Sequence, residues 1–301
     1  MTTQLVDSGI EEKIIRVIGG VNNLPTPPIV FSQIQKVLNN PNTSAFDIAA
    51  ILQEDPAISA KVLKLTNSAY YGLTKEIESV RQAVVIVGME AIKNLVLSAS
   101  MFAAFSSSQL DKEFQDVFWR HSLGTAFAAR LLAHKLKANM GFDAEAAFSA
   151  GMLHDIGKMV ISVYMQDDAK KLSELKLQKP DTPDHVLEEE VLGYNHAQIG
   201  SLLAKQWKLP HKLQETIMFH HFPQLTESDN NNLPYLIHMS DYLAHYTFDY
   251  DAEEDKEFKM ATQEGILDYV GTSLDGLVSF SPLLREEYSK SETFMEMAKG
   301  L

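Results

Sequence analysis

The chain has 301 residues, of which 45% are hydrophobic, enough to bury one large core or two smaller ones. Its 40 acidic and 26 basic residues leave an excess of negative charge that repels phosphate backbones, which argues against broad nucleic-acid binding. No cysteine is present, so disulfides and thiolate metal sites are excluded.

The N-terminus, MTTQLVDSGIEEKII, lacks the basic start and the apolar block of a secretory signal. No apolar stretch approaches the roughly 20 residues that are needed to cross a bilayer. We therefore expect no membrane association and a cytoplasmic location.

Helical signals begin near residue 44, where Thr43 or Ser44 can cap a helix over 44–54. Asp55 and Pro56 then begin a second helix, which we expect to continue until Gly72.

Ser79 and Gln82 have the spacing of a capping box for the next helix. The short apolar run AVVIVG could be a buried strand, but it lies between helical patterns, so we interpret it as a helix that ends at Gly88.

The pair of segments 80–87 and 89–105 could form a helix-turn-helix that reads DNA. Between residues 80 and 100, however, the only charged side chains are Arg81, Glu90 and Lys93. A DNA-reading element needs more basic residues than this, so we interpret the pair as core packing.

The same periodicity continues to the C-terminus and predicts an all-α protein. We expect an N-terminal helical lobe over 1–110, a lobe with the histidines over 111–250, and an acidic helical extension over 251–301. Residues 249–301 contain 13 acidic and 5 basic residues, which is typical of a solvated helical face. The expected helices are 89–105, 111–138, 143–165, 166–178, two in 184–210 broken near Gly193, one from Pro210, 232–248 and 255–270.

All ten histidines lie between His121 and His245. Within the apolar run GMLHDIGKMV, His154 and Asp155 are adjacent, and a buried charge of this kind is costly unless it is paired. If metal alone compensates this cost, removing Asp155 should leave the metal-free chain no less stable. The candidate ligands, most of which interrupt apolar segments, are His121, His154, Asp155, His196, His220, His221 and Asp241.

The remaining histidines are less distinctive. His238 precedes Asp241 by three residues, so it can either support a ligand or lie on the surface. We interpret the other four, His134, His185, His211 and His245, as structurally ordinary.

Without thiolates, imidazole and carboxylate ligands suit zinc, iron, manganese or nickel. The candidate ligands are separated by gaps of 33, 42, 24 and 20 residues, which excludes a zinc finger because its ligands come in close pairs. Such gaps fit a bundle in which several helices project ligands into one cavity.

Lys158 follows Asp155 by three residues and His154 by four, so all three can share one helix face. A lysine there can bind an anion such as a phosphate oxygen, or it can extend its ammonium to solvent. The sequence leaves both alternatives open.

The series of histidines and aspartates, with its LHDIGK and HH motifs, resembles the HD superfamily of metal-dependent phosphohydrolases and its HD-GYP branch. Three N-terminal segments resemble the HDOD domain, the HD-related output domain of bacterial signalling proteins. Together with the histidine and aspartate series, the resemblance covers roughly residues 15 to 250. It implies an HD-type helical bundle with an N-terminal helical lobe. These segments are NLPTPPIVFSQIQKVLNN, AAILQEDPAISAKVLKLTNSAYYG and SVRQAVVIVGMEAIKNLVLS.

The resemblance also implies two divalent transition-metal ions. One ion would be held by His121, His154, Asp155 and Asp241. The second would share Asp155 as a bridge and would add His196, His220 and His221.

Two departures separate this chain from the HD-GYP branch. That branch places a Gly-Tyr-Pro segment soon after its double histidine, and HHFPQLTESDNNNLP contains none. It can also use a glutamate one helical turn before the first histidine, where this chain has Val117. The resemblance therefore does not imply hydrolysis of cyclic di-GMP.

Two functions follow from the resemblance. The chain can be a signalling protein with a binuclear phosphohydrolase site, in which Asp155 bridges the ions and Lys158 steadies the phosphate of a phosphoester or nucleotide. Alternatively, it is a non-catalytic output module with a structural or vestigial metal site, which contacts a signalling protein partner through its acidic tail.

Overall fold

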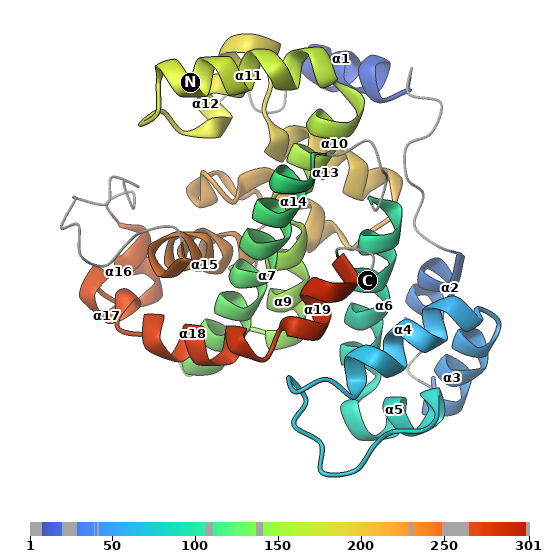
Figure 1. Ribbon diagram of the computed structural model, residues 1–301. Coiled ribbons are helices and arrows are strands. Elements are labelled where there is room, and N and C mark those ends of the chain that lie inside the picture. The colour runs from blue at the N-terminus through green and yellow to red at the C-terminus, as the bar shows by residue number, and fades with distance from the viewer. Residues whose placement is uncertain are drawn as a thin grey trace. The chain divides into compact units, whose positions relative to one another are not determined.

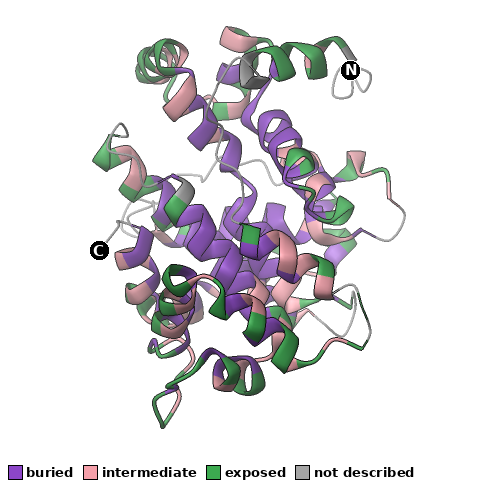
Figure 2. Ribbon diagram, turned by 90° about the vertical axis from the view of Figure 1, so that its right-hand side faces the viewer, coloured by how far each residue is buried: buried purple, intermediate pink, exposed green. Residues whose placement is uncertain are grey.

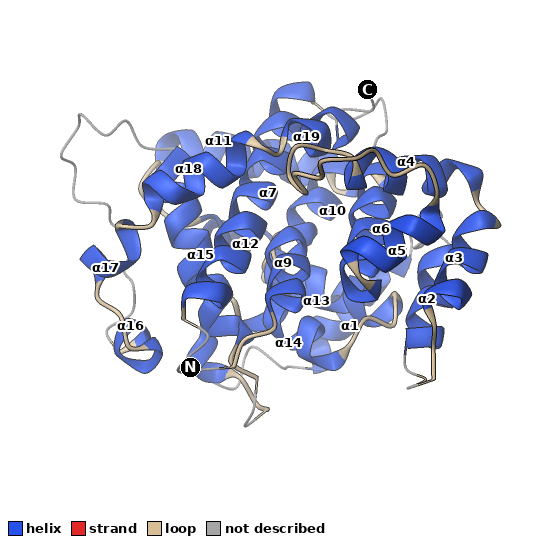
Figure 3. Ribbon diagram, turned by 90° about the horizontal axis from the view of Figure 1, so that it is seen from below, coloured by secondary structure: helices blue, strands red, loops and turns tan. Residues whose placement is uncertain are grey.

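The computed structural model describes residues 8–19, 29–38, 40, 42–105, 111–136, 141–228, 231–248 and 265–298. All regular secondary structure in these residues is helical, and they contain no strand (Figure 1, Figure 3). The predicted all-α class is confirmed. Among the described helices, none combines the length and the apolar character that a membrane span requires.

The chain folds into two compact units. The described helices have buried and exposed faces (Figure 2). The first unit comprises Met1–Leu24 and Gly124–Ser281, and the second comprises Pro25–Leu123 and Pro282–Leu301. Helix α7, Lys112–Lys135, belongs to both, because the division falls between Leu123 and Gly124. The lobe boundaries expected from the sequence, 1–110, 111–250 and 251–301, stay a prediction.

The second unit begins with helices whose caps can be recognised in the sequence. Ser44 caps α3 in a capping box with Asp47, and Asp55 caps α4 with Pro56 at its first position. Besides part of α7, the unit contains α2 (Ile29–Leu38), α3 (Ala45–Gln53), α4 (Pro56–Thr66), α5 (Val80–Val87), α6 (Met89–Ala104), most of α18 (Ser281–Ser289) and α19 (Glu292–Ala298).

Helix α4 ends at Thr66, so the prediction that it continues to Gly72 is wrong. The reason is that the Asn67 side chain bonds the backbone of Ile77 as a neighbouring backbone segment would. Asn67 donates from Nδ2 to the Ile77 carbonyl at 2.9 Å and accepts from the Ile77 N–H at 2.7 Å. This pair fixes the returning chain and replaces a further helical turn.

Ser79 caps α5 by accepting the Gln82 N–H, as predicted, but the reciprocal half of the capping box is different. The Gln82 side chain accepts from the N–H of Glu78 at 3.2 Å instead of that of Ser79. Helices α5 and α6 meet at Gly88 and bury Val84 and Ile92, so the interpretation as core packing is confirmed.

The described part of the acidic extension is not a wholly solvated face. Phe294 on α19 is fully buried and contacts Tyr70 edge to face, with ring centroids 5.6 Å apart. Lys64 pairs with Glu296 at 3.1 Å. Most of the helix expected over 255–270 lies outside the described residues, which resume at 265.

The first unit contains the rest of the helices. The break predicted near Gly193 is confirmed, and Pro210 precedes α14 as expected. The elements are α1 (Ser8–Gly19), the second half of α7, α9 (Ala144–Leu153), α10 (Ile156–Tyr164), α11 (Gln166–Gln178), α12 (Asp184–Leu192), α13 (His196–Gln206), α14 (His211–Phe219), η1 (Pro223–Leu225), α15 (Leu233–Phe248), α16 (Ile266–Val270) and α17 (Leu274–Val278).

The single helix expected over 143–165 is wrong, because the chain breaks between α9 and α10 at His154 and Asp155. The His154 ring bonds the Gly151 carbonyl, an acceptor that a continuing helix would use for its own N–H. The Asp155 side chain does not cap α10 and points to other partners. The motif is therefore a junction between two helices.

Gly157 explains why α10 and α13 can pack so closely. A Cβ added at Gly157 would lie 1.9 Å from the His196 carbonyl oxygen, a distance that no side chain tolerates. Gly200 on α13 is also crowded on this side, since its Cβ would lie 3.2 Å from the Gly157 backbone nitrogen on α10. The small residues let the two helix backbones approach until Asp155 and His196 meet.

We predict that Gly157→Ala lowers the free energy of unfolding by about 3 kcal/mol, because the methyl group must push α13 away from α10. Chemical denaturation measures this cost. Gly124→Ala is the matched control inside a helix, since its Cβ would press on the Phe248 ring edge at 3.0 Å, a side chain that can move, and would meet the Ala244 Cβ at an ordinary contact distance of 3.6 Å. Equal stability of the two variants would contradict the steric argument.

Candidate metal centre

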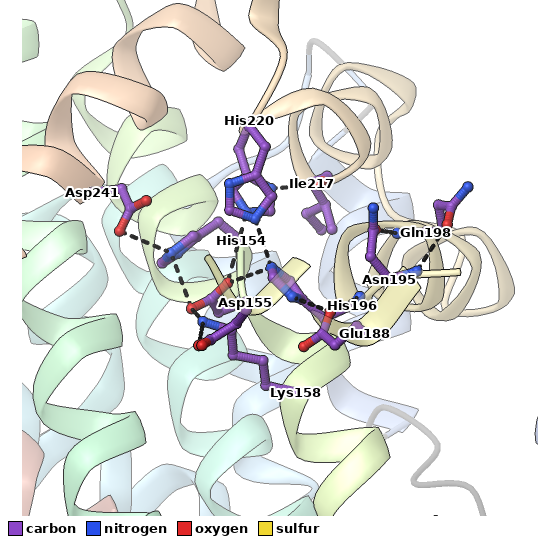
Figure 4. A network of polar contacts seen from close by, with 12 residues as sticks. His154, Asp155, Lys158, Glu188, Asn195, His196, Gln198, Ile217, His220 and Asp241 are labelled. Carbon is purple, nitrogen blue, oxygen red and sulfur yellow. Dashed lines mark hydrogen bonds and ion pairs between the residues drawn. The ribbon is translucent and has the colours of Figure 1, made fainter. Parts of the chain in front are cut away.

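Asp155 lies at the centre of a buried polar cluster in the first unit (Figure 4). Its Oδ2 accepts from Lys158 Nζ at 2.9 Å and lies 3.5 Å from His154 Nε2. Its Oδ1 lies 3.0 Å from His196 Nε2 and 3.7 Å from His220 Nε2. One carboxylate thus contacts groups from three separate segments.

The break between α9 and α10 orients His154. Its Nδ1 donates to the Gly151 carbonyl at 2.8 Å, which directs Nε2 toward Asp155 and Asp241. Nε2 lies 3.8 Å from Asp241 Oδ1. A neutral imidazole held this way offers the lone pair of Nε2 to a cation.

His196 opens α13, whose start is fixed by a capping box between Asn195 and Gln198. Its Nδ1 donates to Glu188 Oε2 at 2.7 Å, and the same oxygen accepts the His196 backbone N–H at 2.7 Å. Both residues are buried, so this carboxylate fixes the ring and leaves Nε2 directed at Asp155.

His220 and His221 follow the last turn of α14. The Nδ1 of His220 donates to the Ile217 carbonyl at 2.7 Å, and its buried Nε2 makes no hydrogen bond. His221 Nε2 lies 2.9 Å from His196 Nε2. The His221 ring also stacks on His185 of α12, with centroids 4.2 Å apart.

Helix α15 supplies Asp241 and two further histidines. His245 Nε2 lies 3.4 Å from Asp241 Oδ1, and His238 donates from Nδ1 to the His220 carbonyl at 2.8 Å. His238 is buried, so the surface alternative is wrong, whereas its role in supporting a ligand stays a prediction.

The Lys158 ammonium is paired with carboxylates, although 22% of the side chain is exposed. Its Nζ lies between two carboxylates, 2.9 Å from Asp155 and 3.3 Å from Asp184 at the start of α12. Lys176 of α11 pairs with the other oxygen of Asp184 at 3.0 Å. The α11–α12 pair is thereby tied to the polar cluster by charge.

The histidines of the cluster have pKa values shifted in opposite directions. Burial lowers the pKa of His196, but Glu188 and Asp155 outweigh burial and raise it to about 9. Burial lowers the pKa of His220 to about 4 and that of His185 to about 4 as well. His221 has a pKa well below its ordinary value for the same reason.

The two central charges hold each other ionised. Burial raises the pKa of Asp155, but His154 and Lys158 outweigh this effect and hold it well below its ordinary value. Burial lowers the pKa of Lys158, but Asp155 and Asp184 raise it well above its ordinary value. The charge of Lys158 lowers the pKa of Asp184 below its ordinary value, and this attraction outweighs burial, which acts in the opposite direction.

Four of the candidate ligands converge closely enough for one ion. One ligand atom from each of Asp155, His196, His220 and His221 can be chosen so that all lie within 4.8 Å of one another. Three imidazoles, each of which must lose its Nε2 proton or already lack it to bind a metal, and a carboxylate are a donor set that divalent transition metals favour. The buried Nε2 of His220, which makes no hydrogen bond, is directed into this group, so the residues fit a metal ion.

His121 lies on α7 in the part that belongs to the second unit, and its role as a ligand stays a prediction. The other six sequence-predicted ligands all belong to the first unit. There His154, Asp155, His196, His220 and His221 are neighbours, and Asp241 adjoins His154.

Sequence reasoning did not anticipate the contacts that α12 and two further histidines make with the cluster. His185 and His245, interpreted as ordinary, contact His221 and Asp241 respectively. Asp184 and Glu188 were not singled out, although they are separated by four residues and so share one helix face. That spacing was the available signal, but the run of acidic residues around it resembles a solvated face.

A family profile and several relatives match this chain. The profile of the HDOD domain matches residues 24–223. An uncharacterized protein of Treponema pallidum is 30% identical over 201 residues, which are 67% of this chain and 38% of that protein. Ribonuclease Y of Mycoplasma genitalium is 26% identical over 223 residues, again 38% of its length and 71% of this chain. The chain thus spans well under half of each curated relative.

Solved structures share the fold. A Shewanella amazonensis protein, named "Putative phosphohydrolase", superposes with a TM-score of 0.72 at 25% identity, covering 98% of both chains. An HDOD domain protein of unknown function from Geobacter sulfurreducens gives a TM-score of 0.75 at 22% identity, over 94% of this chain and 99% of that one. A "Putative signal transduction protein" from Marinobacter aquaeolei gives 0.74 at 20% identity, over 96% and 64%.

The contacts of Asp155 contradict the premise behind the expectation that its removal leaves the metal-free chain no less stable, because metal is not the only group that can compensate its charge. Because Lys158 and His196 already compensate its charge, Asp155→Ala removes one carboxylate partner from each of these cationic groups and leaves them only Asp184 and Glu188. We predict that it lowers the free energy of unfolding of chelator-treated protein by about 3 kcal/mol.

A double-mutant cycle with Lys158→Met tests this pairing. The cost of the double variant should fall short of the sum of the single costs by about 1 kcal/mol or more, because each single change breaks the same contact. Additive costs would show that the pair does not stabilise the metal-free protein.

Proposed function

This chain belongs to the HDOD family, and on that premise we propose that it is a bacterial signalling protein that binds two divalent transition-metal ions and hydrolyses a phosphoester. The observation that carries the proposal is the convergence of Asp155, His196, His220 and His221 within 4.8 Å. The name of the Shewanella protein, to which this chain is similar along its whole length, supports the reaction class.

The proposed ligands form two overlapping sets. His154, Asp155 and Asp241 would hold the first ion, with His121 as the fourth ligand that the resemblance implies. Asp155 would be shared with the second ion, which His196, His220 and His221 complete. Iron, manganese, zinc and nickel all suit such imidazole and carboxylate ligands.

When bound, such ions supply Lewis acidity toward a phosphoryl oxygen and toward water. The protein's own part is to orient the ligand side chains in a buried site. Carbonyl and carboxylate acceptors hold the Nδ1 atoms of His154, His196 and His220, so the rings cannot turn away. Lys158 would steady a phosphate oxygen, since its pKa keeps the ammonium charged beside Asp155.

A second candidate function is a non-catalytic output module, and one observation favours it. Lys158 is held by Asp155 and also by Asp184, so two carboxylates compete with any phosphate for its ammonium. In that case the metal would stabilise a surface that a signalling protein partner recognises. Either function is consistent with the proposed cytoplasmic location.

Metal analysis of single variants tests the shared ligand. We predict that Asp155→Ala reduces the content of both ions, because a bridging carboxylate offsets the repulsion between two cations. His221→Ala should mainly cost the second ion and His121→Ala mainly the first. Elemental analysis after equilibration with buffered metal, and melting midpoints with and without chelator, measure these effects.

His134→Ala is the matched control for those histidine variants, since His134 is exposed on α7. It should bind as much metal as the wild type. Full metal content in Asp155→Ala, or a wild type that binds no metal and is unaffected by chelator, would refute the bridged site.

A substrate comparison separates this chain from the HD-GYP branch. We predict that metal-saturated protein hydrolyses a small phosphodiester but leaves cyclic di-GMP intact or cleaves it very slowly, since positioning supplies much of the rate at such sites. Chromatography of nucleotide products measures this. Rapid formation of the linear product would contradict it, and no turnover of any phosphoester would favour the output module.

A further inference from the structure

The buried histidines of the cluster differ in what holds their Nδ1 atoms. His154 and His220 donate to neutral backbone carbonyls, at 2.8 and 2.7 Å. His196 instead donates to the carboxylate of Glu188 at 2.7 Å. A carboxylate polarises the imidazole more strongly than a carbonyl does, so it makes the far nitrogen a better ligand.

Helix α12 presents Glu188 to the cluster with little freedom. The Glu188 side chain is 6% exposed, and its Oε2 also accepts the His196 backbone N–H at 2.7 Å. The two glutamates that follow have other partners. Glu189 accepts from Asn195 Nδ2 at 2.7 Å, and Glu190 pairs with Lys179 at 2.7 Å.

The charge balance of the proposed ligands points to the same residue. The first ion would have two carboxylates, Asp155 and Asp241, whereas the second would have only the shared Asp155 and three neutral imidazoles. Two divalent ions bring four positive charges, and Lys158 adds another beside them. A buried carboxylate bonded to a ligand of the second ion offsets part of this excess.

We propose that Glu188 is a positioning residue for the second metal ion. Its carboxylate holds His196 with Nε2 toward the ion and strengthens metal binding through its negative charge. The proposal rests on the proposed function, because it assigns a role toward the same ions. His196 would then be the strongest imidazole ligand of the pair of sites.

Buffered Zn²⁺ titrations of the full chain test the charge and the orientation separately. Glu188→Gln keeps an oxygen that can accept both hydrogen bonds but removes the charge, so it should weaken the second ion about 10-fold. Glu188→Leu removes both the hydrogen bonds and the charge, so it should weaken binding of the second ion by up to about 100-fold and that of the first ion less. Glu190→Gln, an exposed change on the same helix, should bind both ions as the wild type does.

Proton NMR of the metal-free protein supplies a readout that does not depend on metal. The Nδ1 proton of His196, held against Glu188, should appear as a slowly exchanging downfield resonance in wild type and Glu188→Gln and should vanish in Glu188→Leu. Wild-type affinity for both ions in Glu188→Leu, or survival of that resonance, would overturn the proposal. A wild type that binds no ion refutes the proposed function, while the resonance still decides whether Glu188 holds His196.

Discussion

The carboxylate of Asp155 sets the main constraint on the first unit. Only 2% of the residue is exposed, and a charge at that depth must be balanced by cations or by hydrogen-bond donors. Lys158, His154 and His196 provide that balance, and they come from three different positions along the chain. The surrounding helices are therefore fixed by an electrostatic requirement as well as by apolar packing.

The requirement extends outward in layers. Lys158 is balanced in turn by Asp184, and Asp184 by Lys176, so alternating charges connect α10, α12 and α11. On the other side, Glu188 continues the alternation through His196. A network of this kind has few independent parts, because removing one charge changes the field at every neighbour.

The sequence predicts the fold class and most helices, because caps and periodicity are local. Ser44, Asp55 and Asn195 begin helices through bonds to residues two or three positions away. The site was harder to predict in full. The ligand types and the HD motif are visible in the sequence, but the partners of the ligands depend on contacts between distant segments. Asp184 and Glu188 belong to an acidic helix that a sequence pattern cannot distinguish from a solvated one, and the break at His154 opposes a continuous helical pattern.

The close approach of α10 to α13 places the LHDIGK motif under two independent evolutionary constraints, one on its glycine and one on its candidate metal ligands. The steric demand on Gly157 comes from the His196 backbone, so it persists whatever side chain stands at position 196. A descendant that no longer needed metal could exchange its imidazoles one by one, whereas the glycine would remain under purifying selection. The motif can therefore outlive its chemistry, and a surviving glycine in a relative without the histidines would record common ancestry of the packing and not a retained reaction.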